Sequence, residues 1–79
     1  MYPVTLVVMM KPIVKKFGKR VRQLRLERGL TQEALGDKCG LDLSYIGRIE
    51  RGEQNSSLVV VGMIAKGLGV SVEELFRGM

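Results

Sequence analysis

Four glycines divide this chain into short segments, and their spacing constrains the fold more than any other feature. Gly29, Gly40, Gly52 and Gly69 each follow a segment in which apolar residues recur every three or four positions. That spacing places the apolar side chains on one face of a helix, and glycine readily adopts the left-handed conformation that ends a helix. After the last of these glycines, Ser71 opens a capping box for one more short helix. The sequence therefore predicts an all-α bundle of five short helices with tight connections.

The bounds of the expected helices follow from these glycines and from residues that suit helix starts. Pro12 suits the first turn of the first helix, and Thr31 and Asp42 are expected to cap the second and the third. The expected spans are 12–28, 32–39, 43–51, 58–68 and 72–76. The residues expected to face the core are Ile13, Phe17, Val21, Leu24, Leu35, Cys39, Ile46, Ile49, Leu58, Val61, Ile64, Ala65 and Leu68.

The length of 79 residues limits the chain to one domain with a modest core. We expect residues 1–11 to form an apolar N-terminal extension and residues 12–79 to form the domain. The segment Tyr2–Val8 has a strand-like composition but no second strand to pair with. The extension is far shorter than the ~20 apolar residues of a membrane span, and it lacks the basic start and cleavage site of a signal peptide. We therefore expect a cytoplasmic protein without a membrane partner.

The residue types present exclude several kinds of site. The chain has one cysteine, Cys39, and no histidine, which excludes an internal disulfide, the usual zinc sites, and Ser–His or Cys–His catalytic pairs. We expect no enzymatic activity, no metal and no cofactor. The formal charge is +5, and between Lys11 and Arg28 eight basic residues stand against one acid. Such a stretch is typical of a surface that faces a polyanion, and a solvated helix face explains it equally well.

Residues 32–51 carry the strongest functional signal in the sequence. A helix-turn-helix unit needs two short helices that cross steeply, so that the second can lie in a DNA major groove. The first helix needs a small residue at the crossing, where Gly36 stands, and the turn needs a residue that tolerates positive φ, where Gly40 stands. The apolar residues that would hold the crossing are Leu35, Leu41, Ile46 and Ile49. The unit predicts a DNA-binding domain.

The stretch 17–76 resembles the lambdoid repressor-like family of helix-turn-helix domains, whose members share five helices. Within it, residues 40–46 and 49–52 together with Asn55 are similar to the controller proteins of restriction-modification systems. The resemblance implies a regulator of transcription that binds double-stranded DNA sequence-specifically as a small homodimer. The alternative is an antitoxin that binds a toxin through the apolar extension and represses its own operon.

The motif also implies which side chains face DNA. By position on the motif, Leu43, Ser44 and Arg48 project from the exposed face of the third helix toward base edges. The resemblance places Gln32 at a phosphate, beside the positive start of the second helix. The other expected contacts, all with the DNA backbone, are Tyr45, Arg51 and Asn55. For Tyr45, partial packing in the core is the alternative.

Two further expectations concern contacts within the protein and with a second copy. The resemblance pairs Arg25 with Glu50 in a partly buried ion pair that joins the first helix to the third. The fourth expected helix is apolar around much of its surface, which is typical of a helix that is buried twice. The residues expected at a symmetric dimer interface are Val59, Val60, Met63, Leu75 and Phe76. The apolar extension folding over the bundle is the alternative cover for this surface.

A symmetric dimer implies a palindromic operator, because each subunit reads one half-site. Glu33, Asp37 and Glu50 offer an acidic contact for RNA polymerase, with activation and repression both left open. Cys39 is expected to be a small core residue rather than a redox sensor.

Overall fold

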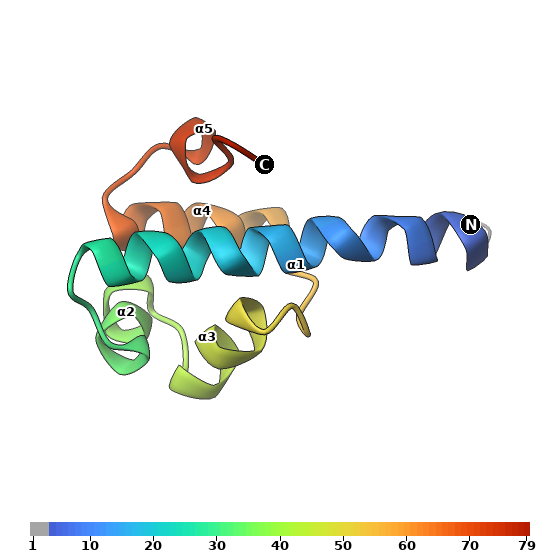
Figure 1. Cartoon of the computed structure of the whole chain (residues 1–79). Helices are drawn as coiled ribbons and strands as arrows, with labels where there is room; N and C mark the ends of the chain where they lie inside the picture. The colour runs from blue at the N-terminus through green and yellow to red at the C-terminus, as the bar shows by residue number, and fades with distance from the viewer. Residues whose placement is uncertain (1–3) are drawn as a thin grey trace.

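The computed structural model describes the backbone of residues 4–79 and the side chains of residues 12–79. Its helices are α1 (Val4–Glu27), α2 (Gln32–Cys39), α3 (Leu43–Glu50), α4 (Leu58–Leu68) and α5 (Val72–Leu75) (Figure 1). No strand occurs in the described part of the chain. The expected all-α fold of five helices is confirmed.

The first helix begins earlier than expected. α1 starts at Val4, and Pro12 lies inside it rather than in its first turn. Proline removes one N–H from the ladder of helix hydrogen bonds, but its own φ is helical. The apolar segment before it has no strand partner, so a helix is the conformation that satisfies the other backbone groups. The strand-like interpretation is therefore wrong for residues 4–8.

Other expectations about the N-terminal extension are not tested. Residues 1–3 lie outside the described part of the chain, and so do the side chains of residues 1–11. Packing of the extension over the bundle is therefore an expectation that lies outside the described residues. The division of the chain at residue 11 stays a prediction, and α1 runs across it.

The core lies between the four longer helices, and α5 closes one side of it with Leu75. The buried apolar side chains are Phe17, Val21, Leu24, Leu35, Cys39, Ile46, Ile49, Val61, Ile64, Ala65, Leu68 and Leu75. Two expected core residues are wrong, because Ile13 is 59% exposed and Leu58 is 82% exposed. Each stands about one turn before the first buried residue of its helix, where no neighbouring helix covers the apolar face.

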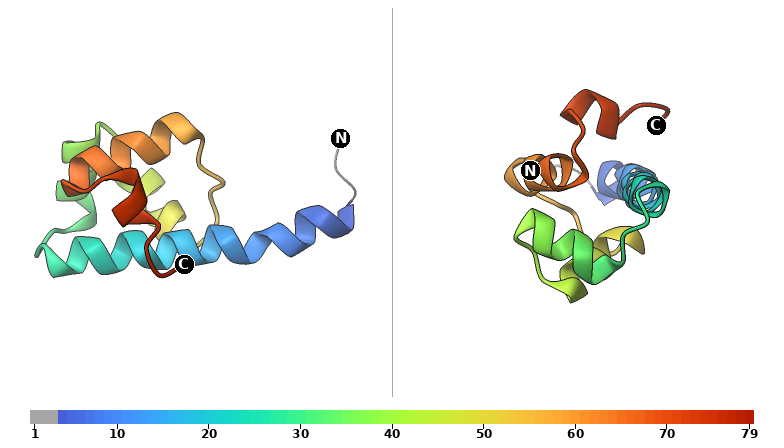
Figure 2. Two further views of the ribbon diagram at one scale, coloured as in Figure 1. Left: turned by 90° about the horizontal axis from the view of Figure 1, so that it is seen from above. Right: turned by 90° about the vertical axis from the view of Figure 1, so that its left-hand side faces the viewer.

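The helices form three layers. α1 and α4 lie side by side in the middle, with α2 and α3 on one side of them and α5 on the other (Figures 1 and 2). Phe76, just after α5, stacks on Phe17 of α1 with ring centroids 5.3 Å apart. α3 packs against α1 and α2. One face of α3 is therefore held by the bundle, and its opposite face points away from it.

Candidate nucleic-acid interface

Two glycines allow α2 and α3 to cross at close range. Gly40 adopts φ +73°, a left-handed conformation that costs other residues energy. Gly36 is buried, and a Cβ there would lie 2.6 Å from the carbonyl oxygen of Leu41. The hydroxyl of Thr31 accepts a hydrogen bond from the backbone N–H of Ala34 and caps α2. The expected roles of these two glycines and of the threonine are confirmed.

A buried ion pair joins α1 to α3. Nε of Arg25 donates to Oε2 of Glu50 at 2.7 Å, and Nη2 donates to Oε1 at 3.0 Å. Nη1 of Arg25 donates to the carbonyl oxygen of Leu30 at 2.7 Å, in the turn before α2. These bonds to the Glu50 carboxylate raise the pKa of Arg25. The expected pair is confirmed.

The burial of Glu50 corrects one expectation and qualifies another. Glu50 is 8% exposed, so it is not available as an acidic contact for RNA polymerase. Nε2 of Gln32 donates to Oε1 of Glu50 at 3.1 Å, which makes Gln32 half-buried rather than freely exposed. Gln32 is the first residue of α2, as expected, but its amide is already tied to the ion pair.

The exposed face of α3 carries the three expected base contacts. Leu43, Ser44 and Arg48 are all exposed. The hydroxyl of Ser44 donates a hydrogen bond to Oδ2 of Asp42, and this bond lowers the pKa of the Asp42 carboxyl. Asp42 stands at the expected N-cap position of α3, but its side chain makes no capping hydrogen bond. The expected capping by the Asp42 side chain is therefore absent.

The packing role considered for Tyr45 is present in the structure, and its contact with the DNA backbone stays a prediction. Tyr45 is half-buried and packs against the core, yet part of it remains at the surface beside Arg48. Cζ of Arg48 lies 5.5 Å from the centroid of the tyrosine ring. This cation–π contact restrains the long arginine side chain on the outer face of α3.

Gln32 and Arg51 meet at Gly47, a residue that the sequence did not single out. A Cβ on Gly47 would lie 3.0 Å from Nη1 of Arg51 and 3.7 Å from Oε1 of Gln32. The arginine therefore reaches back over α3 toward the start of α2, across a position that has no side chain. Nε of Arg51 also pairs with Oε1 of Glu53 at 3.2 Å. Asn55 is exposed in the loop that follows.

Three arginines of the basic stretch 11–28 have structural partners. Arg25 belongs to the buried ion pair described above. Arg20 donates to the carbonyl oxygens of Glu74 and Leu75 at 2.7 and 3.2 Å, at the end of α5. Arg28 donates to the carbonyl oxygen of Leu68 at 2.7 Å, at the end of α4. Such bonds satisfy carbonyl groups that a helix end leaves unpaired.

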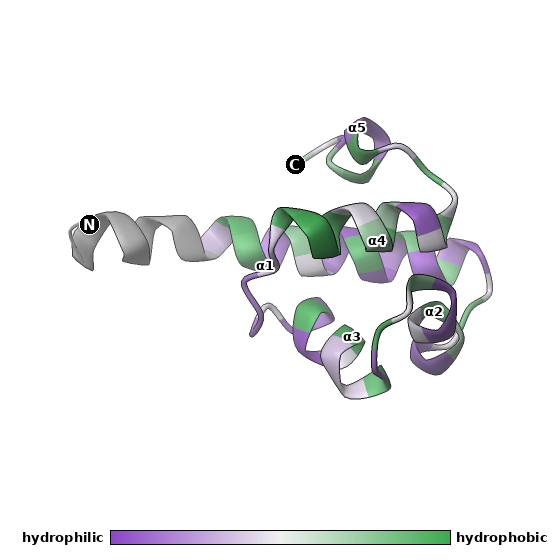
Figure 3. Cartoon of the chain, turned by 180° about the vertical axis from the view of Figure 1, so that it is seen from behind, coloured by the Kyte–Doolittle hydropathy of each residue, from purple (hydrophilic) through white to green (hydrophobic). Residues whose placement is uncertain are grey.

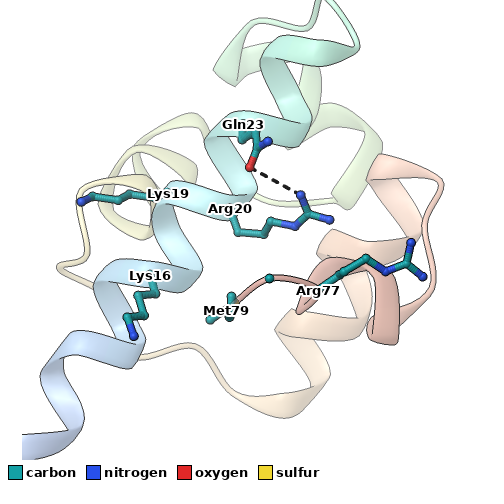
Figure 4. A pocket seen from close by; sticks show the side chains of 7 residues that line it. Lys16, Lys19, Arg20, Gln23, Arg77 and Met79 are labelled. Atoms are coloured by element: carbon teal, nitrogen blue, oxygen red, sulfur yellow. Dashed lines mark hydrogen bonds between the residues drawn. The ribbon is translucent and has the colours of Figure 1, made fainter.

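Lys16, Lys19 and Arg77 lie together at a pocket away from α3. This pocket of about 420 Å³ lies between α1 and the segment that follows α5, and Figure 4 shows its lining side chains. Its lining residues are Lys16, Lys19, Arg20, Gln23, Arg77, Gly78 and Met79. α5 and α3 are on opposite sides of the middle layer, so these residues lie on another side of the molecule from α3. The interpretation of the basic stretch as a surface that faces a polyanion stays a prediction.

Other kinds of site find no support in the described residues. No group of acids and cysteine there has the arrangement of a metal site. Within the same part of the chain, no helix is both long and apolar enough to cross a membrane. Burial raises the pKa of the Cys39 thiol, which favours the protonated, unreactive form.

Comparison with known proteins decides the family. A family model described as Helix-turn-helix matches residues 21–75, which include α2, α3 and the turn between them. The chain belongs to this helix-turn-helix family. The expected family is thereby confirmed, and it is a family of DNA-binding regulators rather than a class of enzymes.

Within the helix-turn-helix family, several relatives are similar over most of their length. Control protein C.MunI from a Mycoplasma species is 40% identical over 68 residues, which are 85% of this chain and 92% of the relative. Control protein C.BamHI from Bacillus amyloliquefaciens is 45% identical over 60 residues, 75% and 74% of the two chains. The crystal structure of the restriction-modification controller protein C.AhdI from Aeromonas hydrophila matches with a TM-score of 0.80 and 46% identity, covering 82% of this chain and 98% of that one.

Proposed function

We propose that this protein is a dimeric regulator of transcription that binds double-stranded DNA sequence-specifically, of the restriction-modification controller type. The observation that carries the proposal is the outer face of α3. Leu43, Ser44 and Arg48 are exposed there, while Ile46 and Ile49 of the same helix are fully buried. A short helix held in this way presents a rigid row of side chains to a major groove. The similarity to the control proteins supports the controller role.

Base recognition would rest on Arg48, whose guanidinium can donate two hydrogen bonds to O6 and N7 of a guanine. Ser44 can form hydrogen bonds with more than one kind of base. Its bond to Asp42 leaves the hydroxyl oxygen free to accept a hydrogen bond from a base. Leu43 can pack only against apolar groups such as a thymine methyl. Gln32, Arg51, Tyr45 and Asn55 would contact the DNA backbone and set the register of α3.

Replacing Arg48 with alanine is expected to cost about 1–3 kcal/mol of binding to the best operator and to relax preference at one base pair. The operator is first selected from random duplexes, and binding is then measured by fluorescence anisotropy on that duplex and on a scrambled one. Arg77→Ala is the control, because Arg77 is exposed and follows α5, which lies on the opposite side of the middle layer from α3. Equal losses on both duplexes for Arg48→Ala would show that Arg48 contacts the DNA backbone.

The dimer would form through the start of α4. Leu58 is 82% exposed and Val59 is 75% exposed, and the start of α4 is among the most hydrophobic parts of the ribbon in Figure 3. Exposed apolar residues next to one another are typical of an interface. One expected interface residue is wrong, because Leu75 is fully buried in the core of its own chain. Val60, Met63 and Phe76 remain at least partly exposed and stay in the proposal.

We expect a homodimer at micromolar concentration and an operator of two symmetric half-sites, with centres about 34–36 Å apart or a multiple of that distance. Val59→Glu is expected to weaken the dimer at least tenfold, because the interface would bury an unpaired carboxylate. Sedimentation velocity measures both proteins, with Leu26→Glu on α1 as the charge-matched control, since Leu26 is 52% exposed and outside the proposed interface. A wild-type protein that sediments only as a monomer, or a selected operator without a dyad, would contradict the prediction.

The antitoxin alternative depends on the apolar extension, whose side chains lie outside the described residues. Glu33 and Asp37, both exposed on α2, are the remaining acids for a contact with RNA polymerase. The neighbouring genes separate these roles: a restriction endonuclease or methyltransferase gene supports a controller, and a small toxin gene supports an antitoxin.

A further inference from the structure

Arg51 is held by a carboxylate at the edge of the proposed DNA-binding surface. Its Nε lies 3.2 Å from Oε1 of Glu53, and the two side chains are 58% and 55% exposed. Nη1 of the same guanidinium reaches back to Gly47, beside Gln32. Arg51 therefore lies between an acid of the following loop and the start of α2, where a phosphate is proposed to bind.

A carboxylate and a phosphate compete for the same donors. Both accept charge-assisted hydrogen bonds from a guanidinium, often two at a time. DNA that uses Arg51 must therefore take it from Glu53 or share it, and the carboxylate also repels the arriving phosphate. An exposed ion pair contributes little, at most about a fivefold change in an equilibrium constant. That is too weak to prevent DNA binding but enough to change the affinity severalfold.

We propose that Glu53 is an internal competitor for DNA at Arg51, which lowers affinity for all duplexes alike. The inference rests on the proposed function, since it takes Arg51 as a phosphate contact. Binding then replaces the Glu53 carboxylate at Arg51 with a DNA phosphate. Fewer counterions are therefore released from the DNA than the number of basic residues at the interface suggests. Glu53 thereby limits retention on non-specific DNA, whose sites outnumber an operator by about 10⁶–10⁹ in a genome.

The test is Glu53→Gln, which keeps the shape of the side chain and removes its charge. Binding is measured by fluorescence anisotropy on the selected operator and on a scrambled duplex over a series of salt concentrations. We expect affinity for both duplexes to rise about two- to fivefold at low salt, which corresponds to the energy of one exposed ion pair. The slope of log affinity against log salt should steepen by up to about one unit, because the contact of Arg51 with a phosphate then releases a full counterion from the DNA.

Controls separate competition for Arg51 from a general change in charge. Glu73→Gln removes the same charge from the exposed surface of α5, on the far side of the middle layer, and should change affinity less. In the double variant Arg51→Ala/Glu53→Gln, the gain relative to Arg51→Ala alone should be smaller than the gain of Glu53→Gln in the wild type, because only the repulsion between Glu53 and phosphate is then relieved. An undiminished gain in this background, or no gain in Glu53→Gln, overturns the inference. Thermal unfolding checks that each variant is folded.

The same series distinguishes failure of the inference from failure of the proposed function. Arg51→Ala alone should weaken binding to both duplexes. If it does so while Glu53→Gln has no effect, only the competition is overturned. If Arg51→Ala leaves both affinities unchanged, the proposed phosphate contact at Arg51 fails, and the inference fails with it.

Discussion

Arg25→Ala is expected to lower the free energy of unfolding by about 3–5 kcal/mol. The substitution leaves Glu50 without its two guanidinium bonds at a site where the carboxylate is only 8% exposed. Removing one member of a buried pair is costly because the other charge stays out of water without a partner. At about 0.05–0.15 kcal/mol per residue, a domain of this size has a free energy of unfolding of about 4–12 kcal/mol, so such a loss is a large fraction of it.

Urea unfolding followed by circular dichroism measures the effect, with Arg22→Ala as the control. Arg22 lies on the same helix and is exposed, so its loss should cost less than about 0.5 kcal/mol. The double substitution Arg25→Met/Glu50→Leu should recover much of the stability, because apolar residues of similar volume leave no buried charge. Equal effects of Arg25→Ala and Arg22→Ala would mean that the buried pair contributes nothing.

Gly18→Ala is expected to destabilise the fold by about 3 kcal/mol, at the upper end of the usual cost of overpacking. A Cβ at this position would lie 2.2 Å from the carbonyl oxygen of Ile49 and 2.9 Å from that of Glu50. Both atoms belong to the backbone of α3, so the contact is relieved only if α1 and α3 move apart. In an exposed helix the same substitution would stabilise by about 1 kcal/mol, so the packing reverses its sign.

Gly62→Ala is the matched control for Gly18→Ala. Gly62 lies inside α4, is exposed, and has no atom within 4 Å of its Cβ position. We expect a gain of about 0.5–1 kcal/mol from helix propensity. Melting is recorded over a tenfold range of protein concentration, since a change in self-association would make the melting temperature depend on concentration. Similar destabilisation by both substitutions would show that close contact between α1 and α3 is not the cause.

Where helices begin and end could be predicted from the sequence wherever local interactions decide it. α2 has the predicted bounds, because Thr31 bonds a backbone N–H three residues away and Gly40 takes a left-handed conformation at the other end. Ser71 likewise accepts a bond from the N–H of Glu74 at the start of α5. Each of these helix caps involves residues within about one turn of one another. The start of α1 was predicted wrongly at Pro12, which lies inside the helix. Whether a helix begins at a proline or continues through it depends on whether the preceding segment can adopt another conformation.

The candidate DNA-binding surface could be predicted in outline. The motif spacing put Leu43, Ser44 and Arg48 on the exposed face of α3, where the structure has them. The bonds that position the neighbouring side chains could not be predicted. Gln32 donates to Glu50, 18 residues away along the chain, and Arg51 lies across Gly47. Such bonds depend on the angle at which two helices cross and on side-chain rotamers.

The sequence alone determined which residues share a helix face and where most helices end. Tertiary structure decided which turns of those faces are covered, so that Phe17 is buried and Ile13 is exposed. It also decided that Arg20 and Arg28 bond carbonyl groups at helix ends, and that Gly18 must have no side chain. The physical reason is the separation along the chain between the residues that interact. Caps and turns depend on neighbours within a few residues, whereas burial and partner choice depend on segments that only folding brings together.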